Sequence, residues 1–224
     1  MKSRTSRNSR KAFFTGNRRP LFYYVTDRRQ LAGTSLDGCI RRALEWGVDF
    51  IQIREKDLPD SGLYEQVRRA VALAHKTACV IVVNGRADIA MAAGARGVHL
   101  PSTGLRAPDI RPWLPDDFLI GVSAHTVEEI RQAGAEGADY AFLGHLFPTP
   151  SKSGLGDPVG LQCLEKVCAE APIPVFGLGG IHAGRIAAVV DAGAVGVAGI
   201  SLFQGKGAFE ALEKRYPHGG RPPA

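Results

Sequence analysis

One pattern recurs along the chain and constrains its fold more than any other: the end of a helix, a Gly-Ala or Gly-Val step, and a short apolar strand. A glycine at this step can take the left-handed conformation that ends a helix. The apolar run that follows is typical of a strand buried on both faces of a parallel sheet. The copies occupy residues 43–53, 90–100, 132–143 and 189–200. The pattern therefore predicts repeated helix-to-parallel-strand units.

Four further apolar runs bring the number of expected strands to eight. They lie at residues 21–25, 79–83, 118–122 and 173–178. Neighbouring strands are separated by roughly 18 to 35 residues, which leaves room for a crossover helix in each gap. Eight such units favour an α/β fold, a single closed (β/α)8 TIM barrel. A doubly wound open sheet is the alternative, although the sequence GLGGI lacks the dinucleotide-binding spacing.

The charge of the chain is concentrated at its start. The first twenty residues carry seven Lys or Arg and no acid, so the net charge of +6 leaves −1 for the remainder. We expect a basic, disordered tail at 1–19, one barrel domain at 20–214 and a C-terminal tail at 215–224. The barrel then has no basic stripe of the kind that binds a phosphate backbone, so no nucleic-acid partner is expected.

Composition also bears on the compartment. An Arg- and Ser-rich tail is typical of a transit peptide and equally of a disordered extension, which we favour. No apolar run approaches the roughly 18 residues of a membrane span, so no membrane partner is expected. The cysteines show no metal-ligand spacing and are expected to be reduced thiols of a cytoplasmic protein. They are Cys39, Cys79, Cys163 and Cys168. The sequence leaves the oligomeric state open, with a homodimer as the state considered.

In a barrel of this kind the functional site lies at the carboxyl ends of the strands. The polar residues at the expected strand ends are Gln52, Arg54, Lys56, Asn84, Arg86, His99, Ser123, His125, His145, Thr149, Ser151 and Lys152. Strands seven and eight end in residues 177–180 and 199–201, where backbone N–H groups can hold a phosphate. The set is cationic and almost free of carboxylates. It predicts a phosphorylated small-molecule ligand, with no metal and no cofactor.

His145 is the candidate for proton transfer. It follows a buried strand and begins a loop that also contains hydroxyls and a lysine. An imidazole with a pKa near neutrality can act as a general base and then as an acid. The alternative is a histidine packed at a strand end. His99 is either a site residue or a hydrogen-bonded core histidine, and His125 is expected near the start of the next helix.

Seven motifs in order make the sequence similar to the thiamine-phosphate synthase superfamily of barrels over roughly residues 21–204. They are QIREK (52–56), NGRADIA (84–90), GVHL (97–100), GVSAHT (121–126), GADYAFLGHLFPTPSK (137–152), GLGGI (177–181) and AGAVGVAGIS (192–201). In the synthase branch, the resemblance implies a pair of aspartates that hold Mg²⁺ on a pyrophosphate leaving group. This chain has Gly85 and Gly104 at those positions, with Asp88 and Asp109 as the nearest substitutes.

The missing aspartates and the Gly-His pair at 144–145 resemble the thiazole tautomerase branch instead. That resemblance implies isomerisation of a carboxythiazole phosphate to its aromatic tautomer, with His145 as general base and acid. It also implies that Gly180, Ile200 and Ser201 hold the phosphate and that Thr149, Ser151 and Lys152 fix the rest of the anion. The residues that match the pyrimidine pyrophosphate site of the synthases are Gln52, Arg54, Lys56, Asn84 and Ser123. Our main expectation is therefore a thiazole tautomerase, with thiamine-phosphate synthase or a non-catalytic ligand-binding barrel as alternatives.

Overall fold

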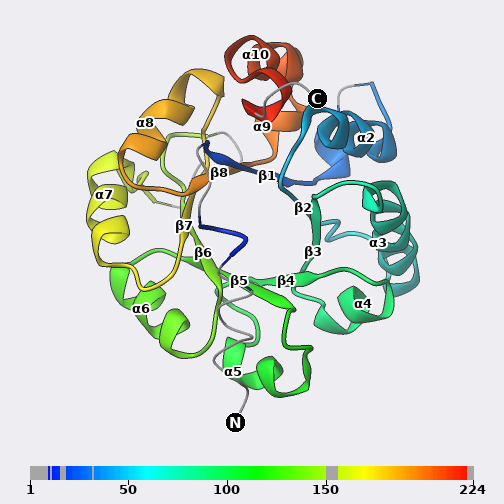
Figure 1. The fold of residues 1–224 in the computed structure, drawn as a ribbon, viewed down its shortest axis with the longest axis horizontal. Coiled ribbons are helices and arrows are strands. Elements are labelled where there is room, and N and C mark those ends of the chain that lie inside the picture. Colours follow the sequence, from blue (N-terminus) through cyan, green and yellow to red (C-terminus); the bar gives the residue numbers. More distant parts are fainter. Residues whose placement is uncertain (1–9, 11, 16–18, 32, 150–155, 221–224) are drawn as a thin grey trace.

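The computed structural model describes residues 10, 12–15, 19–31, 33–149 and 156–220, and all structural statements concern these. Eight parallel strands close into a barrel in the order of the sequence, and helices surround it (Figure 1). The strands are β1 (Leu21–Val25), β2 (Phe50–Ile53), β3 (Val80–Asn84), β4 (Gly97–Leu100), β5 (Leu119–Ala124), β6 (Tyr140–Gly144), β7 (Val175–Leu178) and β8 (Gly196–Gly199). The predicted single (β/α)8 TIM barrel is confirmed.

The helices alternate with the strands, as the recurring pattern predicts. They are α2 (Leu36–Trp46), α3 (Asp60–Ala74), α4 (Ala87–Ala92), α5 (Ala107–Ile110), α6 (Val127–Ala135), α7 (Gly160–Glu170), α8 (Ile186–Asp191), α9 (Ser201–Gln204) and α10 (Ala208–Arg215). The first copy shows how the pattern works. The Ser35 hydroxyl accepts a hydrogen bond from Gly38 N (3.1 Å) at the start of α2, and Gly47 ends this helix in the left-handed conformation, with φ 98°. The chain then enters β2 directly.

Apolar side chains fill two separate layers. Residues such as Ile51, Val83 and Val197 point outward from the strands and pack against the surrounding helices. The second layer lies inside the barrel and includes Tyr23 and Phe50. Both faces of every strand are therefore covered, which accounts for the near-continuous apolar runs in the sequence.

Aromatic rings fill the barrel interior near the starts of the strands. Tyr23 stacks on Phe50 with ring centroids 5.2 Å apart, and Phe176 meets both rings edge to face. The hydroxyls of Tyr23 and Tyr140 form a buried hydrogen bond of 2.7 Å. Burial raises the pKa of both tyrosines, so the pair is neutral. This end of the barrel is a packed core and leaves no channel along the axis.

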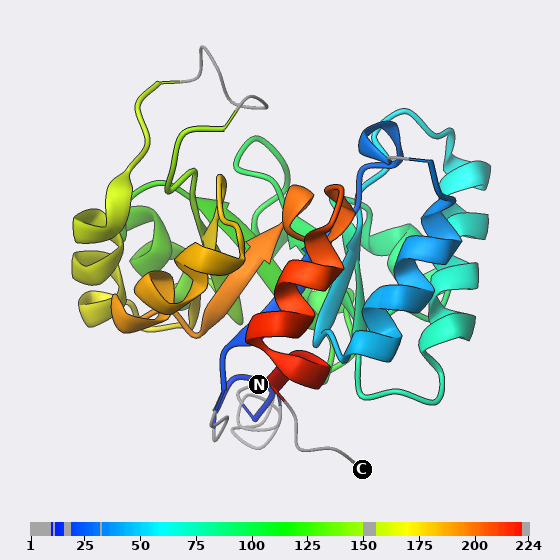
Figure 2. The same ribbon diagram turned by 90° about the horizontal axis from the view of Figure 1, so that it is seen from above.

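A short segment that precedes the barrel closes its N-terminal mouth. Phe14 is 6% exposed and stacks on Phe50 (5.7 Å), while Arg10 donates from Nε to Asp139 Oδ1 (2.7 Å). Figure 1 shows this dark blue segment within the ring of strands, and Figure 2 shows it on the side opposite the loops that follow the strands. Arg10, Phe13 and Phe14 of the expected disordered tail thus contact the barrel. Its other residues, except Arg19, lie outside the described part of the chain.

None of the helices in the described ranges is long and apolar enough to cross a membrane. The four cysteines are free thiols, and Cys39 is buried against the barrel.

Candidate functional site

A cavity of about 500 Å³ opens at the carboxyl ends of the strands. It contains ten of the twelve ligand or catalytic residues predicted from the sequence, because parallel strands bring their ends to one mouth of a barrel. Those that line it are Gln52, Arg54, Lys56, Asn84, Ser123, His145, Thr149, Gly180, Ile200 and Ser201. The remaining two, Ser151 and Lys152, lie outside the described residues.

Two of the predicted polar residues have different surroundings from the rest. Arg86 follows β3 but does not line the cavity, because its guanidinium binds Asp88 (2.7 Å) and Asp60 on the surface. His125 lies just before α6, as expected, and also lines the cavity. Its Nδ1 is hydrogen-bonded to Gly144 O at 3.0 Å, which ties the end of β5 to the end of β6.

The loops after β7 and β8 form the part of the cavity best suited to a phosphate. Gly180 has φ 65°, and a Cβ there would lie 2.7 Å from Phe147 O, so only glycine fits. Arg185 Nη1 donates to Gly180 O (2.7 Å) and steadies the turn. Ile200 and Ser201 begin α9, where the first N–H groups of a helix have no intrahelical acceptor. Backbone donors from two adjacent loops therefore converge on one side of the cavity.

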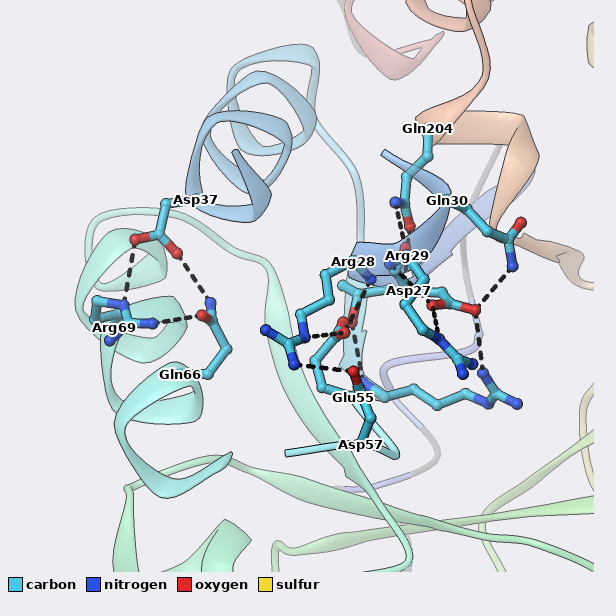
Figure 3. Close-up of polar contacts among 12 residues, drawn as sticks. Asp27, Arg28, Arg29, Gln30, Asp37, Glu55, Asp57, Gln66, Arg69 and Gln204 are labelled. Atoms are coloured by element: carbon cyan, nitrogen blue, oxygen red, sulfur yellow. Dashed lines mark hydrogen bonds and ion pairs between the residues drawn. The ribbon is translucent and has the colours of Figure 1, made fainter. Parts of the chain in front are cut away.

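Arg54 and Lys56 supply the positive charge on another side of the cavity. The backbone of Arg54 is fixed by its N–H, which donates to Thr26 Oγ1 (3.0 Å). Its Nη1 lies 4.0 Å from Asp27 Oδ2. That carboxylate also accepts from Gln30 Nε2 (2.8 Å), as Figure 3 shows. Burial raises the pKa of Asp27, but hydrogen bonds from Arg29 and Gln30 outweigh it, and the net pKa is lowered.

The loop after β1, which carries this carboxylate, is itself held firmly. The backbone N–H of Asp27 donates to Gln204 Oε1, and Gln204 Nε2 donates back to Asp27 O, both at 2.9 Å. Buried Glu55 accepts from Thr26 Oγ1 (2.5 Å) and from Arg28 N (2.9 Å), contacts that Figure 3 places beside Asp27. These hydrogen bonds join the loops after β1, β2 and β8 close to Arg54. Arg54 therefore projects from a rigid support.

The floor of the cavity is polar and buried. Gln52 Nε2 donates to Asn84 Oδ1 (3.0 Å), and His99 Nε2 is hydrogen-bonded to Ser123 Oγ (2.9 Å). The His99 ring lies 4.1 Å from Phe142, and burial lowers the pKa of this histidine to about 3, so it is neutral. Gln52 Oε1 and His99 Nδ1 have no hydrogen-bond partner in the described part of the chain. Buried polar atoms of this kind call for a partner, which a polar ligand can supply.

Sequence reasoning left His99 undecided and missed its neighbours. The structure places His99 on the cavity floor, and Ser102 and Thr103 of the loop after β4 also line the cavity. The available signal was the run PST directly after the fourth strand. Gln30, which was also missed, reaches the cavity from the loop after β1 and had no comparable signal.

The residues present do not fit the Mg²⁺ site that the family resemblance implies. Mg²⁺ is usually held by one or two carboxylates in addition to substrate phosphates. Asp88 falls within α4, is bound by Arg86 and does not line the cavity. Asp109 accepts a hydrogen bond from Arg106 N (2.8 Å) at the start of α5. Over the described ranges, no group of three or more His, Cys, Asp or Glu is placed to hold a metal.

Known relatives are similar in sequence to this chain over most of their length. A putative thiamine-phosphate synthase of Geobacter sulfurreducens is 44% identical over 181 residues, which cover 81% of this chain and 85% of the relative. The thiamine-phosphate synthase of Roseiflexus castenholzii is 38% identical over 84% of this chain and 82% of its own.

These relatives correct the main functional prediction. Each is named as a synthase, which is a transferase, so the predicted thiazole tautomerase, an isomerase, is wrong. The prediction gave most weight to Gly85, Gly104 and the Gly144-His145 pair. Positions 85 and 104 bear on how the charge of a pyrophosphate is neutralised, and residues 144–145 form part of the cavity wall. Neither feature determines which bond is formed in a cavity that both branches share.

One solved structure agrees with the sequence relatives. Thiamine phosphate pyrophosphorylase from Pyrococcus furiosus superposes with a TM-score of 0.77 at 31% identity, over 88% of this chain and 92% of that one. The thiamine monophosphate synthase family model matches residues 22–203, which include the cavity residues and all of the eight strands except the first residue of β1. The chain therefore belongs to the thiamine monophosphate synthase family.

Proposed function

We propose that this chain is a thiamine-phosphate synthase, a transferase that joins hydroxymethylpyrimidine pyrophosphate to thiazole phosphate. The observation that carries the proposal is the 44% identity, over 81% of this chain, to a relative named as a putative thiamine-phosphate synthase. The cavity supports it with two separate anion-binding regions. One consists of the loops after β7 and β8, and the other is the cationic side formed by Arg54 and Lys56.

The two regions suit the two substrates. Backbone N–H groups at Gly180, Ile200 and Ser201 would bind the phosphate of the thiazole, because oriented N–H dipoles favour an anion. Arg54 and Lys56 would bind the pyrophosphate, whose charge rises as it leaves. The buried amide of Gln52 and the neutral ring of His99 would orient a flat heterocycle between these regions.

The reaction needs positioning and charge stabilisation more than proton transfer. The bond between the pyrimidine methylene carbon and the pyrophosphate oxygen breaks, and its electrons leave with the pyrophosphate. The lone pair of the thiazole nitrogen then forms the new carbon–nitrogen bond. That nitrogen carries no proton, so the step requires no general base. His145 lines the cavity, and we assign it to the wall that orients the substrates.

Several finer expectations belong to this proposal. The substrates are phosphorylated small molecules, and the protein acts in the cytoplasm without a nucleic-acid or membrane partner. A homodimer is the assembly considered, and the oligomeric state stays open. The substrate class follows from the synthase chemistry, and the expectation of no nucleic-acid partner follows from the charge distribution described above.

Turnover of the two substrates tests the proposal. The purified chain is incubated with both, and thiamine phosphate is quantified after oxidation to its fluorescent thiochrome form. We expect product above a heat-inactivated control. The absence of product, with both substrates shown to bind, would overturn the assignment.

Three variants sharpen the assay. Arg54→Gln should lower kcat/KM by roughly tenfold or more, because it removes a charge that stabilises the leaving group. Arg86→Gln is the matched control, since Arg86 also follows a strand but binds surface carboxylates outside the cavity. It should leave turnover unchanged. His145→Asn should stay within roughly threefold of the parent, whereas general acid–base catalysis would make the loss 10²-fold or more.

A further inference from the structure

The cavity contains no acid among the described residues that line it. Its charged side chains are Arg54 and Lys56, and its three imidazoles belong to His99, His125 and His145. An anion that enters therefore meets positive charge and hydrogen-bond donors on several sides. A hard divalent cation would meet only neutral oxygen and nitrogen atoms, which hold Mg²⁺ poorly without a carboxylate.

The two positions that the family resemblance assigns to metal-binding aspartates lie together in the structure. A Cβ built on Gly85 would lie 3.7 Å from Pro101 Cδ, and one built on Gly104 would lie 3.3 Å from the same atom. Pro101 itself lines the cavity. Both positions therefore flank one proline ring at the cavity edge, and this chain places no carboxylate at either.

The nearby acids are already bound by other partners. Burial in part raises the pKa of Asp88, but the hydrogen bond from Arg86 is the larger influence and lowers it. Asp27 accepts from Arg29 and Gln30 and lies 4.0 Å from Arg54. A metal bound by Asp27 would have to displace the Arg29 and Gln30 donors and would lie close to the Arg54 guanidinium.

We infer that this chain binds a pyrophosphate-type anion without a divalent cation, with Arg54 and Lys56 neutralising its charge. The inference rests on the proposed function for the identity of the anion. It adds that the metal requirement implied by the family resemblance is absent here because positions 85 and 104 are glycine. Mg²⁺ then acts only in solution, where it lowers the charge of free pyrophosphate and competes with the site for it.

Binding of inorganic pyrophosphate to the full chain tests this directly. Isothermal titration is done once in EDTA and once in excess Mg²⁺, at constant ionic strength because salt screens exposed charges. We expect binding in EDTA that is as tight as binding in Mg²⁺, or tighter. Arg54→Gln should weaken the EDTA value by roughly tenfold, and Arg86→Gln should leave it unchanged. Tenfold tighter binding in Mg²⁺, or no binding in EDTA, would overturn the inference.

Restoring the carboxylates provides the complementary test. The double variant Gly85→Asp, Gly104→Asp should gain at least tenfold in pyrophosphate affinity when Mg²⁺ replaces EDTA. The same double change to Asn is the matched control, since Asn has the same shape without the charge and both residues tolerate the φ of 69° at position 85. The Asn variant should show no gain. The thermal midpoint shows whether the Asp variant folds. A folded Asp variant whose pyrophosphate affinity does not change with Mg²⁺ would refute the role given to these two positions.

Failure of the inference and failure of the proposed function give different results. A parent chain that makes thiamine phosphate but binds pyrophosphate only with Mg²⁺ retains the function and loses the inference. A parent chain that binds pyrophosphate in EDTA but makes no product loses the proposed function and retains the inference.

Discussion

The two mouths of the barrel are built from the same eight strands and differ in almost every physical respect. At the strand starts, Phe14, Tyr23 and Phe50 form an aromatic stack, and Asp139 pairs at the same end with Arg10 and Arg111. At the strand ends, Gln52 and His99 keep polar atoms without a partner in the described part of the chain. Aromatic rings fill the first end, whereas the second has polar atoms that a ligand can satisfy. Stability and function can therefore be altered separately, each at its own end.

The largest effect should come from Asp139→Asn at the N-terminal mouth. Asp139 accepts from Arg10 Nε (2.7 Å), Arg111 Nη2 (2.6 Å) and Ile120 N (2.9 Å). Removal of its charge leaves two largely buried guanidiniums without their anion, which should lower the free energy of unfolding by about 3–5 kcal/mol. Urea denaturation measures this. Asp117→Asn is the control, because Asp117 pairs with Arg96 at 3.7 Å on the surface and should change stability by less than about 1 kcal/mol. Equal losses of unfolding free energy in the two variants would contradict the larger contribution assigned to the buried ion pairs of Asp139.

Phe14→Ala tests whether the segment before the barrel belongs to its core. Phe14 contacts Phe50, Tyr140 and Phe176, so truncation should cost about 3 kcal/mol in the free energy of unfolding. Turnover per folded molecule should not change, since the cavity is at the other mouth. Trp113→Ala is the control, because this aromatic residue is 47% exposed. A Phe14 variant of parental stability would show that the segment merely rests against the mouth.

At the other mouth the expected effect is on activity. Gly180→Ala places a methyl group 2.7 Å from Phe147 O and 2.8 Å from Pro148 O, so the phosphate loop must shift. A shift of about 1 Å at a binding loop can cost roughly 10²-fold in rate. Steady-state kinetics should show that loss, with a small change in thermal midpoint. Gly156→Ala is the control, since a Cβ there meets nothing within 4 Å. A variant with normal kcat/KM would remove this loop from the site.

The smallest effect concerns the boundary between the two ends, where His99 is buried. Its pKa is lowered to about 3 by burial, while an unfolded histidine has a pKa of about 6.5. The unfolded state therefore binds a proton that the folded state does not, and stability is lost as the pH falls from about 6.5 towards 3. Between pH 7 and pH 5 this amounts to about 2 kcal/mol. Denaturation of the parent and His99→Gln at both pH values isolates it as a difference. The same loss in both proteins would mean that His99 is solvated.

The fold could be predicted from the sequence more completely than the site. Every strand was located, because a strand buried on both faces is an uninterrupted apolar run, and four of the eight runs also follow a helix-ending glycine. The strand ends then named most of the cavity residues, such as Arg54 and Gly180, since the barrel itself brings strand ends together. The choice between the synthase and the tautomerase reaction was wrong. The reaction was inferred from two carboxylates that are absent. Their absence changes the energetics of a chemical step but does not identify which step the site catalyses.

The contacts of the N-terminal segment could not be predicted for a different reason. Arg10 and Asp139 are 129 residues apart, and nothing local near Phe14 distinguishes a docked aromatic residue from an exposed one. The basic composition around it is typical of a solvated tail. Only the closed barrel creates the aromatic mouth that Phe14 enters. Long-range packing of this kind lies beyond periodicity and composition.

The docked position of Phe14 and Arg10 also fixes an order of events during synthesis. A protein leaves the ribosome from its N-terminus, so these two residues emerge before any strand of the barrel. Their partners Tyr140, Asp139 and Phe176 belong to the sixth and seventh strand–helix units and emerge late. Arg10 and Phe14 therefore reach their final place only after the later part of the barrel has been made. Until then the nascent chain carries the aromatic ring of Phe14 without the core that covers it.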